Sequence, residues 1–233
     1  MVDWDKWRGK ELMLKVVVFD GGYGGECFAD LLCEQLPVVE VIRVIDWRNA
    51  DVLLKNSRRA RKIAVDALRP YIGRVDLIVF ANHLLSITSL KYFKRKYKHQ
   101  KFEGFCLKEP DTFIKRDVII LTTKAVTKTI NYYNYIFRVK RRIKTIALDD
   151  WPMKIDDGEL TNEELRKDLD SNLDENIRKH GEVVLACSQF SDIKKELRDY
   201  FGNNVKMYDS FEDTLRKICK TLNIRGGIGR KIK

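Results

Sequence analysis

The feature of this sequence that most constrains its fold is a regular alternation of short apolar runs with longer amphipathic segments. The apolar runs have the length of strands, and the amphipathic segments repeat with the period of helices. We predict strands at 15–20, 40–45, 76–81, 102–107, 117–122, 143–148, 182–187 and 204–208. We predict helices at 26–35, 53–71, 86–97, 124–137, 161–179, 189–200 and 210–222. Such alternation indicates a largely parallel sheet that helices cover.

The predicted strands fit either one eightfold barrel or two four-stranded sheets. A barrel typically takes about 250 residues, and the chain has 233. Two stretches, 76–97 and 182–202, repeat the same order of strand, short polar elbow and amphipathic helix. The repetition favours an α/β fold with two sheets that face each other and bind a ligand at the carboxyl ends of their strands.

The cysteine pattern and the hydropathy indicate in which cellular compartment the protein is expected. The cysteines, Cys27, Cys33, Cys106, Cys187 and Cys219, form no CxxC pair and accompany no histidine cluster. This pattern favours reduced thiols over a disulfide or zinc framework. No apolar run approaches the roughly 18 residues of a membrane span, and no charged-then-apolar leader opens the chain. We therefore expect a soluble, cytoplasmic protein with no membrane partner and no metal site.

The net charge of +11 is unevenly distributed. Segment 149–175 holds 11 acidic and three basic residues, so the rest of the chain carries +19. Much of the positive charge lies in 91–101 and 138–144. Because a basic patch attracts anions of any kind, we expect weak, salt-sensitive and sequence-independent binding to polyanions. Whether the acidic connection 149–174 folds over the ligand site as a lid stays open at this point.

Aromatic residues interleave with the basic ones in 91–101. Tyr92, Phe93 and Tyr97 would stack on exposed bases if the segment bound single-stranded RNA. The alternative is that they point inward beneath a solvated helix face. We favour the inward interpretation, because a basic patch by itself reports only non-specific attraction to anions.

Polar residues stand where four of the predicted strands give way to loops. They are Asp20, Asn82, Thr123 and Cys187. The carboxyl ends of parallel strands converge on one crevice, so these side chains can combine into a site. Each also has a purely structural role open to it. Asp20 and Asn82 are able to cap turns, and Cys187 fits a core position.

Four glycines lie within 21–25, directly behind Asp20. A dinucleotide fingerprint needs a small third residue where Cys27 stands, and a phosphate-binding P-loop needs a lysine that the segment lacks. What remains is a tight strand-to-helix elbow whose backbone amides approach a small anion. Phosphate and carboxylate both suit such an elbow.

The elbow sequence "VVVFDGGYGG" resembles the "DSGxGG" opening of the aspartate/glutamate racemase superfamily, most closely its glutamate racemases. Further similar segments follow in the same order along the chain. They are "EQLP" at 34–37, "FANH" at 80–83 in the place of a "CNT" motif, "LACSQ" at 185–189 in the place of "GCTH", and "RDYFGNNV" at 198–205. The resemblance implies two α/β sandwich domains related by a pseudo-twofold axis, with a cleft between them. It implies a first domain formed by residues 1–97 and 205–233, and a second domain formed by residues 98–204.

The resemblance also implies chemistry without a cofactor. In that family one cysteine thiolate removes the α-proton of an amino acid, and a second thiol on the opposite face returns one. The match breaks at catalytic positions, where Ala81 replaces the first cysteine and His83 a threonine. Further replacements are Gly21 for a serine, Ser188 for a threonine and Gln189 for a histidine. The retained residues are Asp20, Asn82, Thr123 and Cys187.

Three functions follow from this altered motif. The first is an amino-acid racemase in which Cys187 and His83 act on opposite faces and Asp20 tunes them. Its substrate-binding residues would be Gly21, Asn82, Thr123, Ser188 and Gln189. The second is a one-thiol, decarboxylase-type lyase with an apolar pocket at 52–54 and 84–85. The third is a catalytically inactive relative that binds a small acid, a protein or nucleic acid. The expected partners are a small amino acid or dicarboxylate and, in a homodimer, a second copy of the chain.

Overall fold

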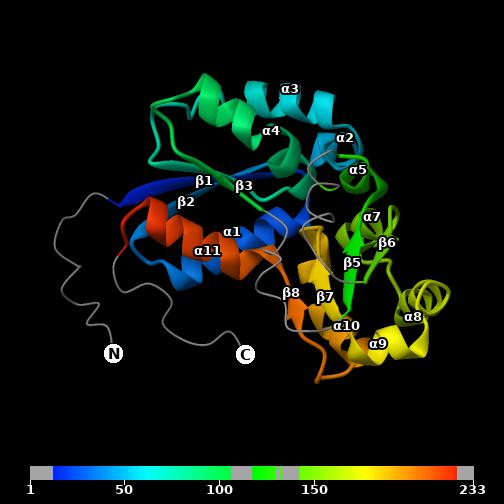
Figure 1. The fold of residues 1–233 in the computed structure, drawn as a ribbon. Helices are drawn as coiled ribbons and strands as arrows, with labels where there is room; N and C mark the ends of the chain where they lie inside the picture. The colour runs from blue at the N-terminus through cyan, green and yellow to red at the C-terminus, as the bar shows by residue number, and fades with distance from the viewer. Residues whose placement is uncertain (1–12, 106–116, 130–131, 133–141, 225–233) are drawn as a thin grey trace, which may run out of the picture.

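The computed structural model describes residues 13–105, 117–129, 132 and 142–224 (Figure 1). The strands form two separate four-stranded sheets in which every pair is parallel. The first sheet has the order β2-β1-β3-β4, with bounds β1 (Leu14–Asp20), β2 (Val39–Ile45), β3 (Leu77–Phe80) and β4 (Phe102–Gly104). The second has the order β6-β5-β7-β8, with bounds β5 (Val118–Thr122), β6 (Ile143–Ala147), β7 (Glu182–Leu185) and β8 (Met207–Tyr208). The two orders are the same permutation, as the internal repetition predicts, and the barrel alternative is wrong.

Helices connect and cover these strands. Those of the first half are α1 (Tyr23–Gln35), α2 (Ala50–Lys55), α3 (Ser57–Leu68) and α4 (His83–Lys96), with a short 3₁₀ turn η2 (Trp47–Asn49). The later ones are α5 (Lys124–Thr127), α7 (Trp151–Asp156), α8 (Asn162–Asp170), α9 (Glu175–His180), η4 (Gln189–Ser191), α10 (Lys194–Phe201) and α11 (Ser210–Thr221). Within the described ranges, no helix is long and apolar enough to cross a membrane.

Both faces of the first sheet are covered. Val16 and Val18 of β1 pack with residues of α1 and α11, whereas Val17 and Phe19 pack with residues of α3 and α4. Figure 1 shows these two helix pairs on opposite sides of the sheet. Because successive side chains of a strand point to opposite faces, a strand covered on both sides is apolar at every position. This is why β1 reads as a continuous apolar run.

The second sheet is covered in the same way, and each of its core clusters includes a residue of the first domain, Leu54 in one and Leu84 in the other. Ile119 and Leu121 of β5 pack with residues of α7, α8 and α10. Val118 and Ile120 point to the other face, where their cluster includes Leu84 of α4. Apolar packing through Leu84 therefore joins the two domains.

Each predicted strand overlaps an observed one, but two predicted helices are each divided in two. The predicted helix 53–71 is interrupted at Asn56, whose side-chain oxygen accepts a hydrogen bond from the Arg59 amide and caps α3. The predicted helix 161–179 is interrupted before Asp174, which caps α9. Side chains that bond to their own backbone compete with helix continuation, so an amphipathic period alone does not reveal such breaks. Of the predicted helix 124–137, much lies outside the described residues.

The chain passes from one sheet to the other at slightly different points from the expected domain boundaries. β4 pairs with β3 in the first sheet although it follows residue 97, and β8 pairs with β7 in the second sheet although it follows residue 204. After β8 the chain returns to the first domain, where Leu215 and Ile218 of α11 join the core beneath β1. The exact division of the chain into domains stays a prediction.

The aromatic residues of 91–101 point inward, as we favoured. Phe93 is fully buried in the core of the first domain. Tyr92 and Tyr97 are half-buried, and cationic side chains lie over their rings: Arg61 and Lys96 over Tyr92, and Lys96 over Tyr97. These rings are therefore not free to stack on nucleic-acid bases.

We predict that Phe93→Ala lowers the free energy of unfolding by about 3–5 kcal/mol, the usual cost of emptying a buried aromatic site. The Phe93 ring lies 4.9 Å from that of Phe80 and 5.4 Å from that of Phe102, centroid to centroid. Urea denaturation followed by circular dichroism measures the change. As the control, Lys91→Ala replaces an exposed residue of the same helix and should change stability by less than about 0.5 kcal/mol. A loss below about 1 kcal/mol for Phe93→Ala would contradict the inward packing.

Candidate functional site

The glycine elbow between β1 and α1 is a point of close approach between the two domains. A Cβ atom added to Gly24 would lie 2.4 Å from the Cβ of Ser188, and one added to Gly22 would lie 2.3 Å from Oδ2 of Asp156. Such distances are too short for any side chain. The glycines are therefore required because residues of the second domain pack directly on the elbow.

Asp20 is the centre of a hydrogen-bonded network at this contact. Its side chain is fully buried. Oδ1 accepts hydrogen bonds from the Gly21 amide at 2.7 Å and from Nδ2 of Asn82 at 3.0 Å. Oδ2 lies 3.1 Å from the hydroxyl of Ser188, which comes from the second domain. Asn82 also accepts a hydrogen bond from the Leu85 amide, so its role as the N-cap of α4 fixes the amide that it turns toward Asp20.

Burial raises the pKa of Asp20 to about 7, although the hydrogen bonds from Asn82, Gly21 and Ser188 oppose the shift. The cause is the cost of moving a charge from water into the protein interior. Asp20 therefore exchanges a proton close to neutral pH. When it is ionised, the Ser188 hydroxyl donates to it. When it is protonated, it can donate to Ser188 and release that hydroxyl toward Gln189, whose Oε1 is 3.0 Å away.

Cys187 joins the network through Gln189. Its thiol donates to Oε1 of Gln189 at 3.1 Å, and the Nε2 of Gln189 lies 3.4 Å from Oδ2 of Asp156. Burial raises the pKa of the Cys187 thiol far above its usual range, and the nearby carboxyl groups of Asp20 and Asp156 add to the shift. Cys187 is therefore a neutral thiol in this structure.

His83 lies outside this network, although it follows Asn82 directly. Its Nε2 is 2.7 Å from the hydroxyl of Ser210, and its ring packs edge-on against Phe105. Its Nδ1 is buried, and no residue of the described ranges forms a hydrogen bond with it. Burial lowers the pKa of His83 to about 3, because an uncharged imidazole costs less to bury than an imidazolium. Ala81, two residues before His83, is part of the apolar core beneath β1.

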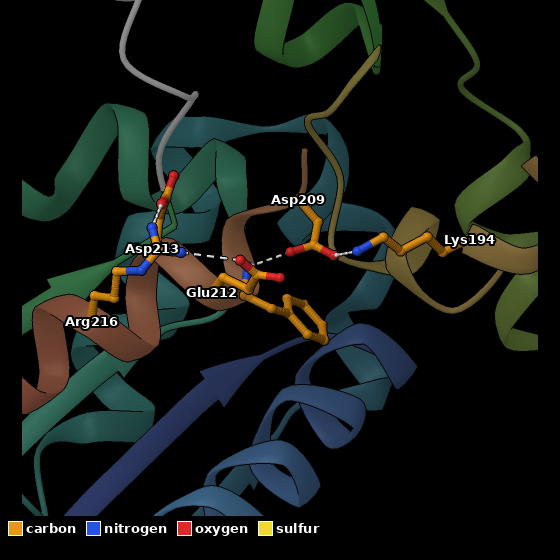
Figure 2. Close-up of polar contacts among 6 residues, drawn as sticks. Lys194, Asp209, Glu212, Asp213 and Arg216 are labelled. Carbon is orange, nitrogen blue, oxygen red and sulfur yellow. Dashed lines mark hydrogen bonds and ion pairs between the residues drawn. The ribbon is translucent and has the colours of Figure 1, made fainter. Parts of the chain in front are cut away.

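The contact with Ser210 depends on how α11 begins. Asp209 caps α11 by accepting a hydrogen bond from the Phe211 amide at 3.1 Å. The other carboxylate oxygen of Asp209 forms a 2.7 Å ion pair with Lys194 of α10 (Figure 2). Figure 2 also shows Arg216 paired with Glu212 and Asp213 one turn further along α11. Both domains therefore help to hold Ser210 against His83.

Thr123 is buried at the end of β5 and is the N-cap of α5. In the described part of the chain, no hydrogen bond joins its side chain to the Asp20 network. The structure thus brings together six of the eight residues proposed from the sequence and leaves two apart. The six are Asp20, Gly21, Asn82, Cys187, Ser188 and Gln189, and the two are His83 and Thr123. Their roles stay predictions.

Asp156 is the residue of this site that the sequence did not reveal. It lies at the end of α7, within the acidic connection, where nothing distinguishes it from ten other acidic residues of 149–175. Trp151 and Ile155 of α7 are buried in the core of the second domain, and they hold the helix in place. Asp156 then accepts a hydrogen bond from the Tyr23 amide at 2.9 Å. This part of the acidic connection therefore packs on the glycine elbow.

The leucine residues suggested for a lyase pocket are packed into the cores of the protein. Leu53, Leu54, Leu84 and Leu85 are all buried, and they belong to three different core clusters. Leu84 alone among them lines a cavity of about 410 Å³. That cavity lies between the start of α3, α4 and α5, and its polar lining residues are Lys55, Asn56, Ser57, Thr88, Lys128 and Thr129. Among the described residues, no three His, Cys, Asp or Glu side chains gather closely enough to hold a metal ion.

We predict that Gly24→Ala destabilises the fold by about 1–3 kcal/mol, the usual range for overpacking. Helix propensity alone predicts the opposite, because alanine is better than glycine inside a helix by about 1 kcal/mol. The clash should prevail, since the new methyl group meets the backbone of Ser188 at 2.6 Å as well as its side chain. Chemical denaturation measures the change, with the exposed Glu34→Ala of the same helix as the control. A stabilised Gly24→Ala variant would contradict the close approach.

We predict that Asp20→Asn changes how stability depends on pH. The pKa of Asp20 rises from 3.8 to about 7 on folding, so between these values the folded state binds the extra proton. The contribution of protonated Asp20 to the free energy of unfolding of the wild type is therefore complete below about pH 4. It is lost as the pH rises through 7. Asparagine mimics the protonated acid and does not titrate. The free energy of unfolding of the variant, relative to wild type, should rise by up to about 4 kcal/mol from pH 4 to pH 8. A difference that stays constant across this range would contradict the raised pKa.

No protein-family model matches the chain. A glutamate racemase of Lactococcus lactis subsp. lactis (strain IL1403) is 22% identical over 213 residues, covering 88% of this chain and 78% of that protein. One from Campylobacter jejuni subsp. jejuni serotype O:2 is 22% identical over 219 residues, covering 91% of this chain and 87% of that protein.

Solved structures share the fold. Glutamate racemase from Campylobacter jejuni subsp. jejuni has a TM-score of 0.75 and 21% identity, covering 94% of this chain and 90% of that one. Escherichia coli glutamate racemase, in complex with L-glutamate and the activator UDP-MurNAc-Ala, has a TM-score of 0.75 and 18% identity. The match covers 95% of this chain and 87% of that one. Picrophilus torridus aspartate racemase has a TM-score of 0.61 and 13% identity, covering 90% and 94%. These matches confirm the resemblance to the aspartate/glutamate racemase superfamily, and the solved structures show that this chain has the same fold.

Proposed function

We propose that this chain binds a small acidic amino acid or dicarboxylate between its domains and acts on it as a cofactor-independent, racemase-like isomerase. The observation that carries the proposal is the hydrogen-bonded path from Asp20 through Ser188 and Gln189 to Cys187. The path joins the strand ends of both sheets, where parallel α/β proteins bind their ligands. The relatives are named glutamate and aspartate racemases, and the Escherichia coli protein was solved with L-glutamate.

The proposed chemistry moves protons at the α-carbon of the substrate from two opposite faces. His83 is a neutral imidazole, and its unpartnered Nδ1 would accept the α-proton. The electron pair of the broken C–H bond would pass into the substrate carboxylate. Cys187 is a neutral thiol and would donate a proton to the other face, which leaves a thiolate and an imidazolium. After the product leaves, the imidazolium would lose its proton to water and the thiolate would take one up from water, so that both groups return to their neutral forms.

The bound substrate would have to stabilise these charges, because burial disfavours both. Asp20 and Asp156 lie beside the thiol, and no lysine or arginine of the described residues pairs with either carboxyl group. The α-ammonium group of an amino acid would supply the missing positive charge and would lower the pKa of the Cys187 thiol. To admit it, Ser188 and Asp156 would have to separate from the glycine elbow.

The second candidate is a protein of this fold that binds a small acid without catalysis. It is favoured by Ala81, which cannot carry a proton and is buried in the core. It is also favoured by the site as it stands, since the pKa of His83 is lowered and the pKa of Cys187 is raised, and both shifts oppose proton transfer. The one-thiol lyase has less support, because the residues meant for its apolar pocket lie in core clusters.

We predict that Cys187→Ser reduces α-proton exchange by at least about 100-fold, the usual loss when a group that transfers protons is removed. Serine has a similar size, but its hydroxyl is far less acidic than a thiol. Exchange into deuterated water is followed by NMR with each enantiomer of glutamate and aspartate. Cys33→Ser, at an exposed cysteine, is the matched control and should keep full activity. A fully active Cys187→Ser variant would mean that the site is elsewhere.

The same assay applied to His83→Asn separates the proposals. Under the two-base isomerase this variant should stop conversion between enantiomers while exchange of one enantiomer persists in part. His99→Asn, at an exposed histidine, is its control. Wild-type protein that binds glutamate or aspartate by calorimetry but exchanges no α-proton would establish the second candidate and exclude the first.

A further inference from the structure

The net charge of this protein comes from one part of its chain. Residues 55–101 contain 13 lysines and arginines against two aspartates, a net charge of +11, which equals that of the whole protein. The chain has 45 basic and 34 acidic residues in all, so the remainder holds 32 of each and is neutral. Twelve of the 13 basic side chains are exposed, and the exception, Arg61, is half-buried.

These residues gather on α3, on α4 and just after α4, the pair of helices that covers one side of the first sheet (Figure 1). We call this surface the α3–α4 basic face. Its members are Arg58, Arg59 and Lys62 of α3, Lys91, Lys94, Arg95 and Lys96 of α4, and Lys98 and Lys101 after α4. Arg61 holds the two helices together by donating to Ser89 and to the carbonyl of Thr88.

Few acidic groups neutralise this face. Lys94 forms an ion pair with Glu103 at 3.5 Å. In the described structure, Arg58, Arg59, Lys62 and Arg95 have no ion-pair partner. Four exposed cations without partners repel one another, and a polyanion would remove that repulsion. The acidic segment 149–175, which contains α7 and α8, belongs to the other domain and lies away from this face in Figure 1.

The chemistry of the face selects among polyanions. Its aromatic rings are covered by cations or buried, so it lacks the free rings on which single strands stack their bases. Helices that bind membrane surfaces insert large apolar side chains. Within the described ranges, the exposed large apolar residues are Met13, Tyr23 and Trp47, and none of them lies on α3 or α4. What the face offers is a set of cations on two rigid helices about 20 Å long, and duplex DNA carries one charge per about 1.7 Å.

We propose that the α3–α4 basic face binds the phosphate backbone of double-stranded nucleic acid without reading its sequence. The binding is electrostatic, with a Kd of about 10⁻⁴–10⁻⁶ M at physiological salt. It uses the outer side of the first domain and none of the residues of the Asp20 network, so it is independent of the proposed function.

Two variants that remove the same charge test the proposal. One is Arg58→Gln/Arg59→Gln/Lys62→Gln/Arg95→Gln on the face. The control is Arg166→Gln/Lys167→Gln/Lys195→Gln/Lys206→Gln, at exposed residues of the second half of the chain. We expect the first to weaken binding to 30-base-pair duplexes by more than 10-fold and to reduce the slope of log K against log salt by about 3.6, since each of the four phosphate contacts contributes about 0.9. The control should stay within about threefold of wild type.

Binding is measured by fluorescence anisotropy on two duplexes of unrelated sequence, in DNA and RNA form, and both variants are checked by thermal unfolding. Four results would overturn the proposal. They are equal weakening by the two variants, tighter binding to single strands than to duplexes, binding to vesicles that contain phosphatidylserine but not to duplexes, and no binding to duplexes at 50 mM salt.

Discussion

The arrangement of this protein depends on one buried carboxyl group. Asp20 ends the central strand of the first sheet, and its oxygens bind the Gly21 amide, the Asn82 amide group and the Ser188 hydroxyl. An acid buried without water is tolerated only when its oxygens are satisfied or when it keeps its proton, and Asp20 does both, since its pKa is raised to about 7. The same group therefore fixes the end of β1, the start of α4 and the contact with the second domain.

The glycine elbow follows from that contact. For Ser188 to reach Asp20, the chain after β7 must pass directly over α1, and a Cβ atom at Gly24 would fill the same space. Asp156 reaches the elbow in the same way over Gly22, so α7 is fixed against the first domain although its core lies in the second. The glycine elbow, which includes the predicted substrate-binding residue Gly21, is therefore a contact between the two domains. A ligand at this position has to compete with Ser188 and Asp156 for the elbow.

Electrostatics divide the molecule into two regions of different character. At the domain contact, two carboxyl groups and a thiol lie close together, and no lysine or arginine of the described residues pairs with the carboxyl groups. This environment favours neutral forms and would favour an ammonium group. On the far side of α3 and α4, exposed cations outnumber acids and favour anions. In the first region Cys187 is present, whereas Ala81 stands where the racemase motif has its first cysteine. The second arises from surface residues that the fold does not require.

The sequence by itself determined the fold class, because apolar runs that match covered strands alternate with helical periods from 15–20 to 204–208. Because parallel strands place their carboxyl ends together, it also indicated that Asp20, Asn82 and Cys187 meet at the strand ends. The resemblance to the racemases added Gly21, Ser188 and Gln189, which belong to the same network. Only the tertiary structure decided the rest. Asp156 reaches the site because α7 packs there, and no local pattern distinguishes it from its acidic neighbours. His83 points to Ser210 instead of Cys187, because the start of α11 packs on the start of α4. No pattern near His83 in the sequence reveals that contact.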